Sequence, residues 1–277
     1  MNSRYGKVFR ILRQQKNLPL SYFEKIGIGK SHVGKFERGE VMMSLERVDN
    51  MLQLMNISLG EFEIIVNYYV PDFQNSFLLE IMGAEFHQDK KKLTKLYTEA
   101  KDTENIWLII ISKARVEGLV TKEVSQVKEY LSNIKVWGYF EIILAFSTVD
   151  FFEEEEIVQL IEELKIKNRT NYGDFKYRRS LYHLIFRSIV LLAAKENEKE
   201  ARKALGLMKY FGAGSVDFYI SVLNLLIEGL LEYLYKSKKE GKEAIADALF
   251  MIEKLGNAEF RMYHEKRILK LLGLKQF

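Results

Sequence analysis

The chain has 277 residues, 48% of them hydrophobic and 29% charged, which is the composition of a globular protein with one or two domains. It contains no cysteine, and this excludes disulfides, thiol nucleophiles and thiolate metal ligands. Its four histidines lie far apart in sequence without the short spacing of metal ligands, so we expect neither a metal nor another cofactor.

The apolar runs of the chain are short. The longest, Trp107 to Ile111 and Ile189 to Ala194, have far fewer than the about 20 residues of a membrane-spanning helix. The N-terminal segment also lacks the apolar core and the cleavage site of a signal peptide. We therefore expect a cytoplasmic protein that does not interact with a membrane.

The positive charge is concentrated in the N-terminal segment. The whole chain has a net charge of +4, whereas residues 1–38 hold nine lysines and arginines against Glu24 and Glu37, a net charge of +7. A local basic field of this kind attracts polyanions such as nucleic acids. The charge distribution therefore points to a nucleic-acid partner for this segment.

Five helices are predicted in the first 70 residues from the helical spacing of apolar side chains. Ser58 and Glu61 form a capping box, which starts the fifth helix. Pro71 cannot continue a helix, so we place a domain boundary near 68–74, with one domain at 1–70 and the other at 71–277. The first four helices are expected at 4–16, 20–26, 30–38 and 45–56.

The second domain is also predicted to be entirely helical, because glycine and proline are sparse and few segments alternate with a period of two. The motif from Ala204 to Gly212 recurs 44 residues later, from Ala248 to Gly256. Its spacing is typical of the second helix of a stacked helix hairpin that ends in a left-handed glycine cap. We expect an α-solenoid, and a bundle without repeats remains the alternative. The helices are expected at 73–86, 89–101, 104–117, 121–133, 138–147, 153–167, 174–195, 198–211, 215–236, 241–255 and 258–272.

The segment IGIGKSHVGK, from Ile26 to Lys35, contains three glycines and a Gly-Lys-Ser triplet. A phosphate-binding P-loop needs a glycine where the chain has Glu24, and a dinucleotide fingerprint needs one at His32. Both nucleotide-binding interpretations therefore fail. A turn from Gly27 to Gly29 between two short helices instead predicts a helix-turn-helix, whose second helix enters the major groove of DNA.

Several segments resemble a known family. LPLSYFEKIGIGKSHVGKFERGE, residues 18–40, resembles the Xre-type helix-turn-helix. GKVFRILR (6–13), FERGE (36–40), MNISLGEF (55–62) and VWGYFEIIL (136–144) are similar to the Rgg/GadR/MutR transcription regulators of Gram-positive bacteria. The resemblance covers the whole chain. It implies a homodimeric cytoplasmic regulator whose TPR-like domain, in several relatives, binds a short secreted peptide after its uptake.

Within the helix-turn-helix we predict which side chains contact double-stranded DNA. Lys30, Ser31 and Lys35 are expected to meet base edges, and His32 either contacts phosphate or lies at the rim. Glu37 is expected to pair with a nearby arginine. In the middle of a helix, Gly34 lowers stability by about 1 kcal/mol relative to alanine. Either it lets the helix backbone approach the wall of the DNA groove, or it is merely tolerated. The residues assigned to phosphates are Arg10, Arg13, Arg38, Ser44 and Arg47.

In the second domain, the helix expected at 174–195 carries a cluster of basic and aromatic side chains. Arg179, His183 and Arg187 form a column at i, i+4 and i+8, which on a concave surface clamps the carboxylates of a peptide. A solvated helix edge is the alternative interpretation. The predicted peptide-binding residues are Arg178, Arg179, Tyr182, His183, Arg187 and Asn224.

Other notable residues are given structural roles. Trp137 and Tyr139 are expected in the core, with a groove-lining role as the alternative. The acidic run from Glu153 to Glu156 is expected at a helix start, where carboxylates favour the positive end of the helix dipole. No arrangement of residues supports catalysis, so we expect a protein that is not an enzyme.

The principal prediction is thus a dimeric, sequence-specific transcription regulator that binds an inverted repeat and senses a short signalling peptide, as in quorum sensing. The two recognition helices of a dimer would lie about 34 Å apart. Two alternatives keep the DNA-binding domain. In one, the helical domain serves only oligomerisation or protein interaction. In the other, the protein is a phage-type repressor without a ligand.

Overall fold

The computed structural model describes residues 4–67, 73–168, 175–212, 217–256 and 258–276. Across these ranges the chain forms helices and turns and no strand, which confirms the predicted all-α fold. By its internal contacts the chain divides into unit 1, residues 1–79, and unit 2, residues 80–277. Pro71 and most of the predicted boundary fall outside the described residues, so the domain limits stay a prediction.

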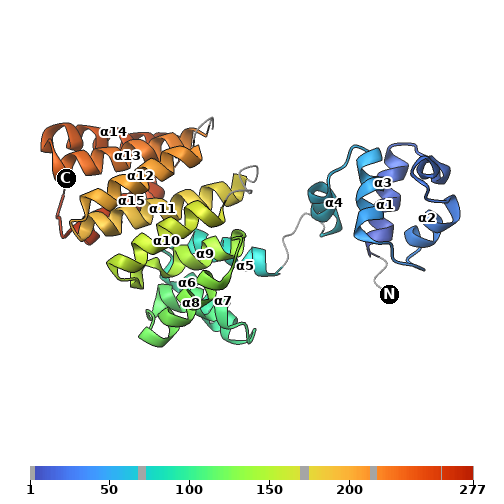
Figure 1. Cartoon of the computed structure of the whole chain (residues 1–277), viewed down its shortest axis with the longest axis horizontal. Coiled ribbons are helices and arrows are strands. Elements are labelled where there is room, and N and C mark those ends of the chain that lie inside the picture. The colour runs from blue at the N-terminus through green and yellow to red at the C-terminus, as the bar shows by residue number, and fades with distance from the viewer. Residues whose placement is uncertain (1–3, 68–72, 169–174, 213–216, 257, 277) are drawn as a thin grey trace. The chain divides into compact units, whose positions relative to one another are not determined.

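Unit 1 contains the five predicted helices (Figure 1). Each observed end lies within about two residues of the predicted one, and the capping box of Ser58 and Glu61 is present. The second helix is a 3-10 helix and not an α-helix. The helices are α1 (Arg4–Gln15), η1 (Leu20–Ile26), α2 (Lys30–Glu37), α3 (Leu45–Leu54) and α4 (Leu59–Val66).

The core of unit 1 joins the first three of these helices. The ring of Phe9 lies 5.5 Å from that of Phe23 and 5.6 Å from that of Phe36, and all three side chains are buried. At Gly6, a Cβ atom would overlap the carbonyl oxygen of Phe36. The backbones of α1 and α2 are therefore in direct contact, which fixes α2 on the core.

Unit 2 is built from helix hairpins that stack along the chain, as predicted (Figure 1). The pairs α6/α7, α8/α9, α11/α12 and α13/α14 pack against each other. The helix that precedes them, α5 (Phe73–Phe86), contains the division between the units. The others are α6 (Lys90–Lys101), α7 (Ile106–Val116), α8 (Thr121–Asn133), α9 (Tyr139–Thr148), η2 (Val149–Phe151), α10 (Glu154–Lys167), α11 (Phe175–Ala194), α12 (Glu198–Gly212), α13 (Phe218–Tyr235), α14 (Lys238–Leu255) and α15 (Ala258–Leu272).

The repeated motif lies on α12 and α14, each the second helix of its hairpin, as expected. Ala204 and Ala248 are fully buried at the helix contacts. The prediction of left-handed glycine caps is wrong. Gly256 has a φ of −116°, and its N–H continues the helical pattern by donating to Ile252. Gly212 also lacks a positive φ; a Cβ there would overlap the hydroxyl of Tyr182, so this glycine serves packing.

The structural roles given to Trp137 and the acidic run are confirmed. Trp137 is fully buried, and its indole N–H donates to the carbonyl of Leu131 at 3.1 Å. Tyr139 is half-buried. Three of the four glutamates form the first turn of α10, and the backbone N–H of Glu153 donates to the carboxylate of Glu156 at 2.8 Å.

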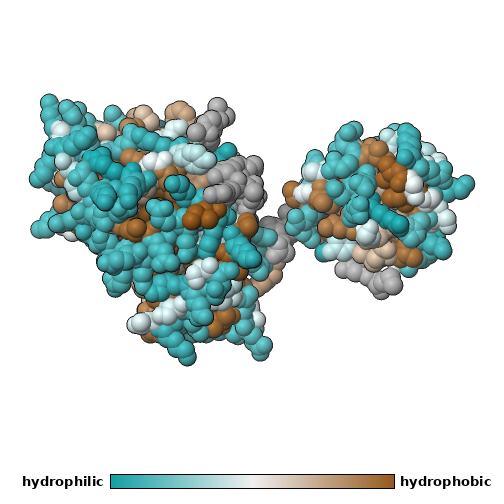
Figure 2. All heavy atoms as spheres, viewed as in Figure 1, coloured by the Kyte–Doolittle hydropathy of each residue, from teal (hydrophilic) through white to brown (hydrophobic). Residues whose placement is uncertain are grey.

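Among the described helices, α13 alone is long and apolar enough to cross a membrane, with a mean hydropathy of 1.3 over 18 residues. It packs against α11, α12 and α14, and Leu223, Leu226 and Ile227 on it are fully buried. Packing against three neighbouring helices explains why α13 is so apolar. On the face seen in Figure 2, both units expose mainly hydrophilic residues with smaller hydrophobic areas between them.

Candidate functional site

The helix-turn-helix has the turn predicted from its glycines. Gly27 ends η1 with a φ of 75°, a left-handed conformation that glycine adopts without strain. Gly29 is the N-cap of α2 and supplies no side-chain hydrogen bond. Between them, Ile28 is buried. The turn is thus anchored in the core and sets where α2 begins.

The two sides of α2 differ as expected. Val33 and Phe36 are buried against the core of unit 1. Lys30, Ser31 and Lys35 are exposed, and His32 is half-buried. The exposed side therefore carries two cations and a hydroxyl, which are groups that donate hydrogen bonds to base edges.

Gly34 is buried on the side of α2 that faces η1. A Cβ atom there would lie 3.6 Å from Cδ1 of Leu20 and 3.2 Å from Nη1 of Arg38. A side chain at position 34 would point at η1 and not at the exposed side of α2. This position favours close packing of the two helices as the explanation for the glycine, over an approach to the DNA groove.

Arg13 is a structural residue, and its assignment to phosphate is wrong. Its Nε and Nη2 donate to the two carboxylate oxygens of Glu37 at 2.6 and 2.9 Å, and its Nη1 donates to the carbonyl of Leu18 at 2.5 Å. The hydrogen bond to Glu37 raises the pKa of Arg13. With its donors engaged and its side chain buried, Arg13 ties α1 to α2. The expected pairing of Glu37 with an arginine is confirmed.

The other residues assigned to phosphates are exposed. Arg38 pairs with Glu40 at 2.5 Å, with about half of each side chain open to solvent. Ser44 is the N-cap of α3 and accepts a hydrogen bond from the backbone N–H of Arg47 at 3.4 Å. Arg10 and Arg47 are also exposed. Exposed arginine and serine side chains are among the groups that donate hydrogen bonds to phosphate oxygens.

The predicted column on α11 is not a charged surface. Arg187 and Tyr182 are buried, with 2% and 0% of their surfaces exposed. His183 is buried as well, and this lowers its pKa to about 4, so the ring is neutral at pH 7. The prediction of an open clamp formed by Arg179, His183 and Arg187 is therefore wrong, because α11 has neighbours on nearly all sides.

The remaining predicted peptide residues lie in different surroundings. Arg179 pairs with Asp217 through Nε and Nη2, at 3.1 and 3.3 Å, and stacks over the ring of Phe175 at 4.0 Å. Arg178 is half-buried next to it. Asn224 is half-buried, and its Oδ1 has no hydrogen-bond partner among the described residues.

A cavity of about 570 Å³ lies between α11, α13, α14 and the start of α15. Its walls are mainly apolar and aromatic, and its only cation among the described residues is Arg179. Arg179 donates to Asp217 through Nε and Nη2, so Nη1 does not take part in this ion pair. Other lining residues are Phe175, Phe218, Tyr219, Met251 and Phe260.

Two buried histidines lie beside this cavity. The rings of His183 and His264 are stacked, 14° from parallel, with their centroids 6.3 Å apart. The hydroxyl of Tyr219 lies 3.4 Å from Nε2 of each. Burial lowers the pKa of His264 well below its ordinary value, as it does for His183. Both rings are therefore neutral parts of an aromatic cluster that includes Phe86 and Phe260.

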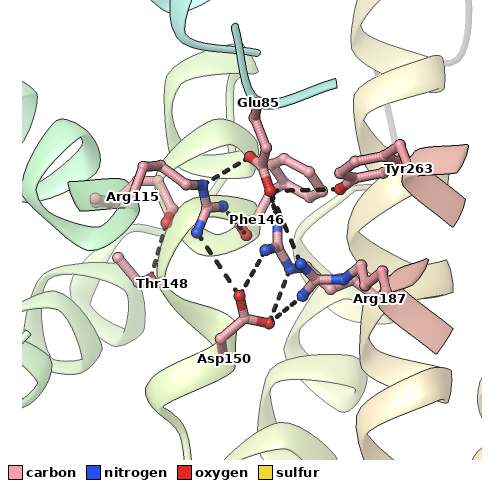
Figure 3. A network of polar contacts seen from close by, with 9 residues as sticks. Glu85, Arg115, Phe146, Thr148, Asp150, Arg187 and Tyr263 are labelled. Atoms are coloured by element: carbon pink, nitrogen blue, oxygen red, sulfur yellow. Dashed lines mark hydrogen bonds and ion pairs between the residues drawn. The ribbon is translucent and has the colours of Figure 1, made fainter. Parts of the chain in front are cut away.

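A polar network at the centre of unit 2 was not found from the sequence (Figure 3). Glu85 of α5 accepts from Nε of Arg115 at 2.7 Å and lies 2.9 Å from Nη1 of Arg187. Asp150 of η2 accepts from Nε and Nη2 of Arg187 at 2.9 and 2.5 Å. The network thus joins four elements that are distant in sequence.

The last helix of the chain, α15, completes the network. The hydroxyl of Tyr263 donates to Glu85 at 3.3 Å (Figure 3). Arg267 donates to Asp150 and lies 3.9 Å from Glu85. Burial by itself would raise the pKa of both carboxyl groups. The surrounding guanidinium groups outweigh it and hold the pKa of each below its ordinary value.

The fold and the exposed α2 surface together define a class of protein, a DNA-binding regulator with a helical-repeat domain. A family model described as the C-terminal domain of the HTH-type transcriptional regulator Rgg matches residues 88–266, and a helix-turn-helix model matches residues 9–62. Because the first match covers more than half of the chain, the protein belongs to the Rgg family of transcriptional regulators. It is a regulator and not an enzyme.

Solved structures share this fold over nearly the whole chain. The SHP pheromone receptor Rgg2 of Streptococcus dysgalactiae is 22% identical, with 96% of this chain and 99% of that chain covered and a TM-score of 0.79. A putative transcriptional regulator of Listeria monocytogenes EGD-e is 16% identical, with coverages of 98% and 99% and a TM-score of 0.81. PrgX in complex with cCF10 is 13% identical, with coverages of 98% and 99% and a TM-score of 0.70.

Proposed function

We propose that this regulator binds an inverted repeat in promoter DNA as a cytoplasmic homodimer. Lys30, Ser31 and Lys35 of α2 read base edges, a role supported by their exposure on the side of α2 that faces away from the core. The phosphate contacts are His32, Arg10, Arg38, Ser44 and Arg47. Two copies are needed because a single short recognition helix reads only half of such a site.

The proposal continues with a short peptide that binds unit 2 and controls the regulator. Two of the similar structures are a pheromone receptor and a PrgX complex with cCF10. The observation that carries the proposal is the cavity beside α11, where aromatic walls surround the partly free guanidinium of Arg179. An apolar side chain of the peptide fills the cavity, and a carboxylate or carbonyl accepts from Nη1 of Arg179.

The base-reading role is tested by Lys35→Ala in the full-length protein. Its preferred site is first selected from random DNA, and affinities are then measured for that site and for unrelated DNA. We expect a loss of about 1–3 kcal/mol on the preferred site and a much smaller loss on unrelated DNA. Arg47→Ala is the control, since loss of a phosphate contact weakens both DNAs alike. Equal losses for Lys35→Ala would contradict the assignment.

The peptide role is tested with protein purified from its own host. Mass spectrometry should find a short, mainly apolar peptide retained by the protein, and the synthetic peptide should raise the melting temperature. Phe218→Ala, on an exposed wall of the cavity, should reduce that shift. Phe250→Ala is the control, because Phe250 is similarly exposed on α14 but does not line the cavity. If no peptide shifts the melting temperature, the result contradicts the proposal and favours the alternative in which unit 2 serves only oligomerisation or protein interaction.

A further inference from the structure

One face of α15 connects the cavity with the buried polar network. Phe260 lines the cavity, and Tyr263 and Arg267 follow it at i+3 and i+7, a spacing that places all three on one side of the helix. We propose that α15 is a latch that relays occupancy of the cavity to α5. This inference rests on the proposed function, since it describes how that same cavity is regulated.

The charges of the network make the latch easy to release. Without α15, the network holds two arginines (Arg115 and Arg187) and two carboxylates (Glu85 and Asp150), and its net charge is zero. Docking of α15 adds Arg267 and leaves one positive charge in excess. Attraction of Arg267 to the carboxylates is offset by repulsion from the two arginines and by the cost of removing it from water. The ion pairs of Arg267 therefore stabilise the docked position of α15 only weakly, and within the network the hydrogen bond from the neutral hydroxyl of Tyr263 to Glu85 is the polar contact that holds it.

Apolar contacts then decide whether α15 stays docked. The ring of Phe260 lies 5.1 Å from that of Phe86 at the end of α5, and the ring of Tyr263 lies 5.0 Å from it. His264 and Ile268 are buried on the same helix. Because Phe260 is both a wall of the cavity and a partner of Phe86, a group in the cavity that displaces the ring of Phe260 also disturbs its packing on Phe86.

The receiving element is α5. Tyr263 and Arg267 contact Glu85, and Glu259 lies 3.6 Å from His87, just beyond the end of α5. The division between units 1 and 2 falls within this helix, so α5 is the covalent connection between them. A ligand that loosens α15 thereby frees the end of the helix through which unit 2 is joined to the DNA-binding unit.

The test fills the cavity without a peptide. Met251 lines the cavity from α14, and the chain has no cysteine, so Met251→Cys introduces a single thiol in the full-length protein. N-benzylmaleimide places an aromatic group in the cavity, and N-methylmaleimide is the matched small control. Hydrogen exchange, read by mass spectrometry, is compared for residues 80–86 and for α15.

With the benzyl group, we expect exchange in α15 and in residues 80–86 to rise about fivefold or more over the methyl control. Exchange that is unchanged or slower in residues 80–86, with labelling confirmed by mass, would overturn the latch. Tyr263→Phe provides a second measurement if the labelled protein unfolds. It removes only the hydroxyl contact with Glu85 and should speed exchange in residues 80–86 about threefold; no change there also counts against the latch.

This experiment separates the inference from the proposed function. The covalent group acts whether or not the protein has a peptide ligand, so its effect on α5 tests the coupling alone. The peptide retained from the host tests the proposed function alone. A coupled latch without a peptide and a peptide without a coupled latch are therefore distinguishable results.

Discussion

At the scale of single residues, burial decides which charged side chains serve the fold and which remain accessible at the surface. Arg13 and Arg38 are both basic residues of the helix-turn-helix unit, and both are paired with a glutamate. Only the Arg13 pair is buried, with two parallel hydrogen bonds that link α1 to α2. Breaking a buried pair leaves an uncompensated charge, whereas an exposed pair is replaced by water.

The two glutamates therefore differ in their effect on stability. Glu37→Ala should destabilise unit 1 by about 3–5 kcal/mol, because Arg13 loses its partner inside the core. Glu40→Ala, in the exposed pair with Arg38, should cost less than about 1 kcal/mol. Hydrogen exchange of α1 and α2 at increasing urea concentration reports on unit 1 by itself. Similar losses for the two variants would show that the burial of the Arg13 pair has no energetic weight.

At the scale of elements, the helix hairpins of unit 2 rely on glycines where backbones meet. A Cβ atom at Gly241 of α14 would overlap the backbone of Tyr233 on α13, and one at Gly229 would lie 2.9 Å from Cβ of Ala244. Gly206 on α12 is different, because nothing lies within 4 Å of a Cβ built there. Glycine in a helix is thus required by packing at some positions and is only a cost at others.

Alanine substitutions at two of these positions should have opposite signs. Gly241→Ala forces α13 and α14 apart and should destabilise unit 2 by about 1–3 kcal/mol. Gly206→Ala should stabilise it by about 0.5–1 kcal/mol, since alanine is the better helix former. Both tryptophans of the chain, Trp107 and Trp137, lie in unit 2, so fluorescence during urea denaturation follows this unit. A stabilising Gly241→Ala would contradict the close backbone contact.

At the scale of the whole molecule, the buried histidines couple stability to pH. Burial lowers the pKa of His183 to about 4 and that of His264 well below its ordinary value. In the unfolded chain, a histidine has a pKa of about 6.5. The unfolded chain therefore binds more protons below pH 6.5. Stability is full above this pH and is lost as the pH falls toward 4. Glu85 and Asp150, whose pKa values are lowered, contribute to the loss only in more acidic solution.

The histidine effect is measurable by urea denaturation at pH 7 and pH 5. His183 alone should account for a loss of about 2 kcal/mol between these two values. In His183→Phe, whose ring suits the surrounding aromatic cluster, the dependence should be weaker by that amount. An unchanged pH dependence in His183→Phe would rule out this source.

The sequence by itself determined the local features of this protein. Three features depend on residues that lie within a few positions of each other: the positions of the helices, the capping box at Ser58 and the turn at Gly27. Local patterns in the sequence therefore predict them. The same is true of the exposed face of α2. The family motifs within residues 6–62 lie in these segments, which is why the helix-turn-helix is predictable from the sequence.

Only the tertiary structure decided how charged residues are used. Glu85, Arg115, Asp150, Arg187 and Arg267 come from five elements, and none has a sequence neighbour that marks it as part of a network. Helical periodicity shows which face of a helix is apolar, but not which distant side chain it meets. A charge on α11 therefore suggested a surface clamp, whereas packing on nearly all sides of that helix turned Arg187 inward to its carboxylate partners.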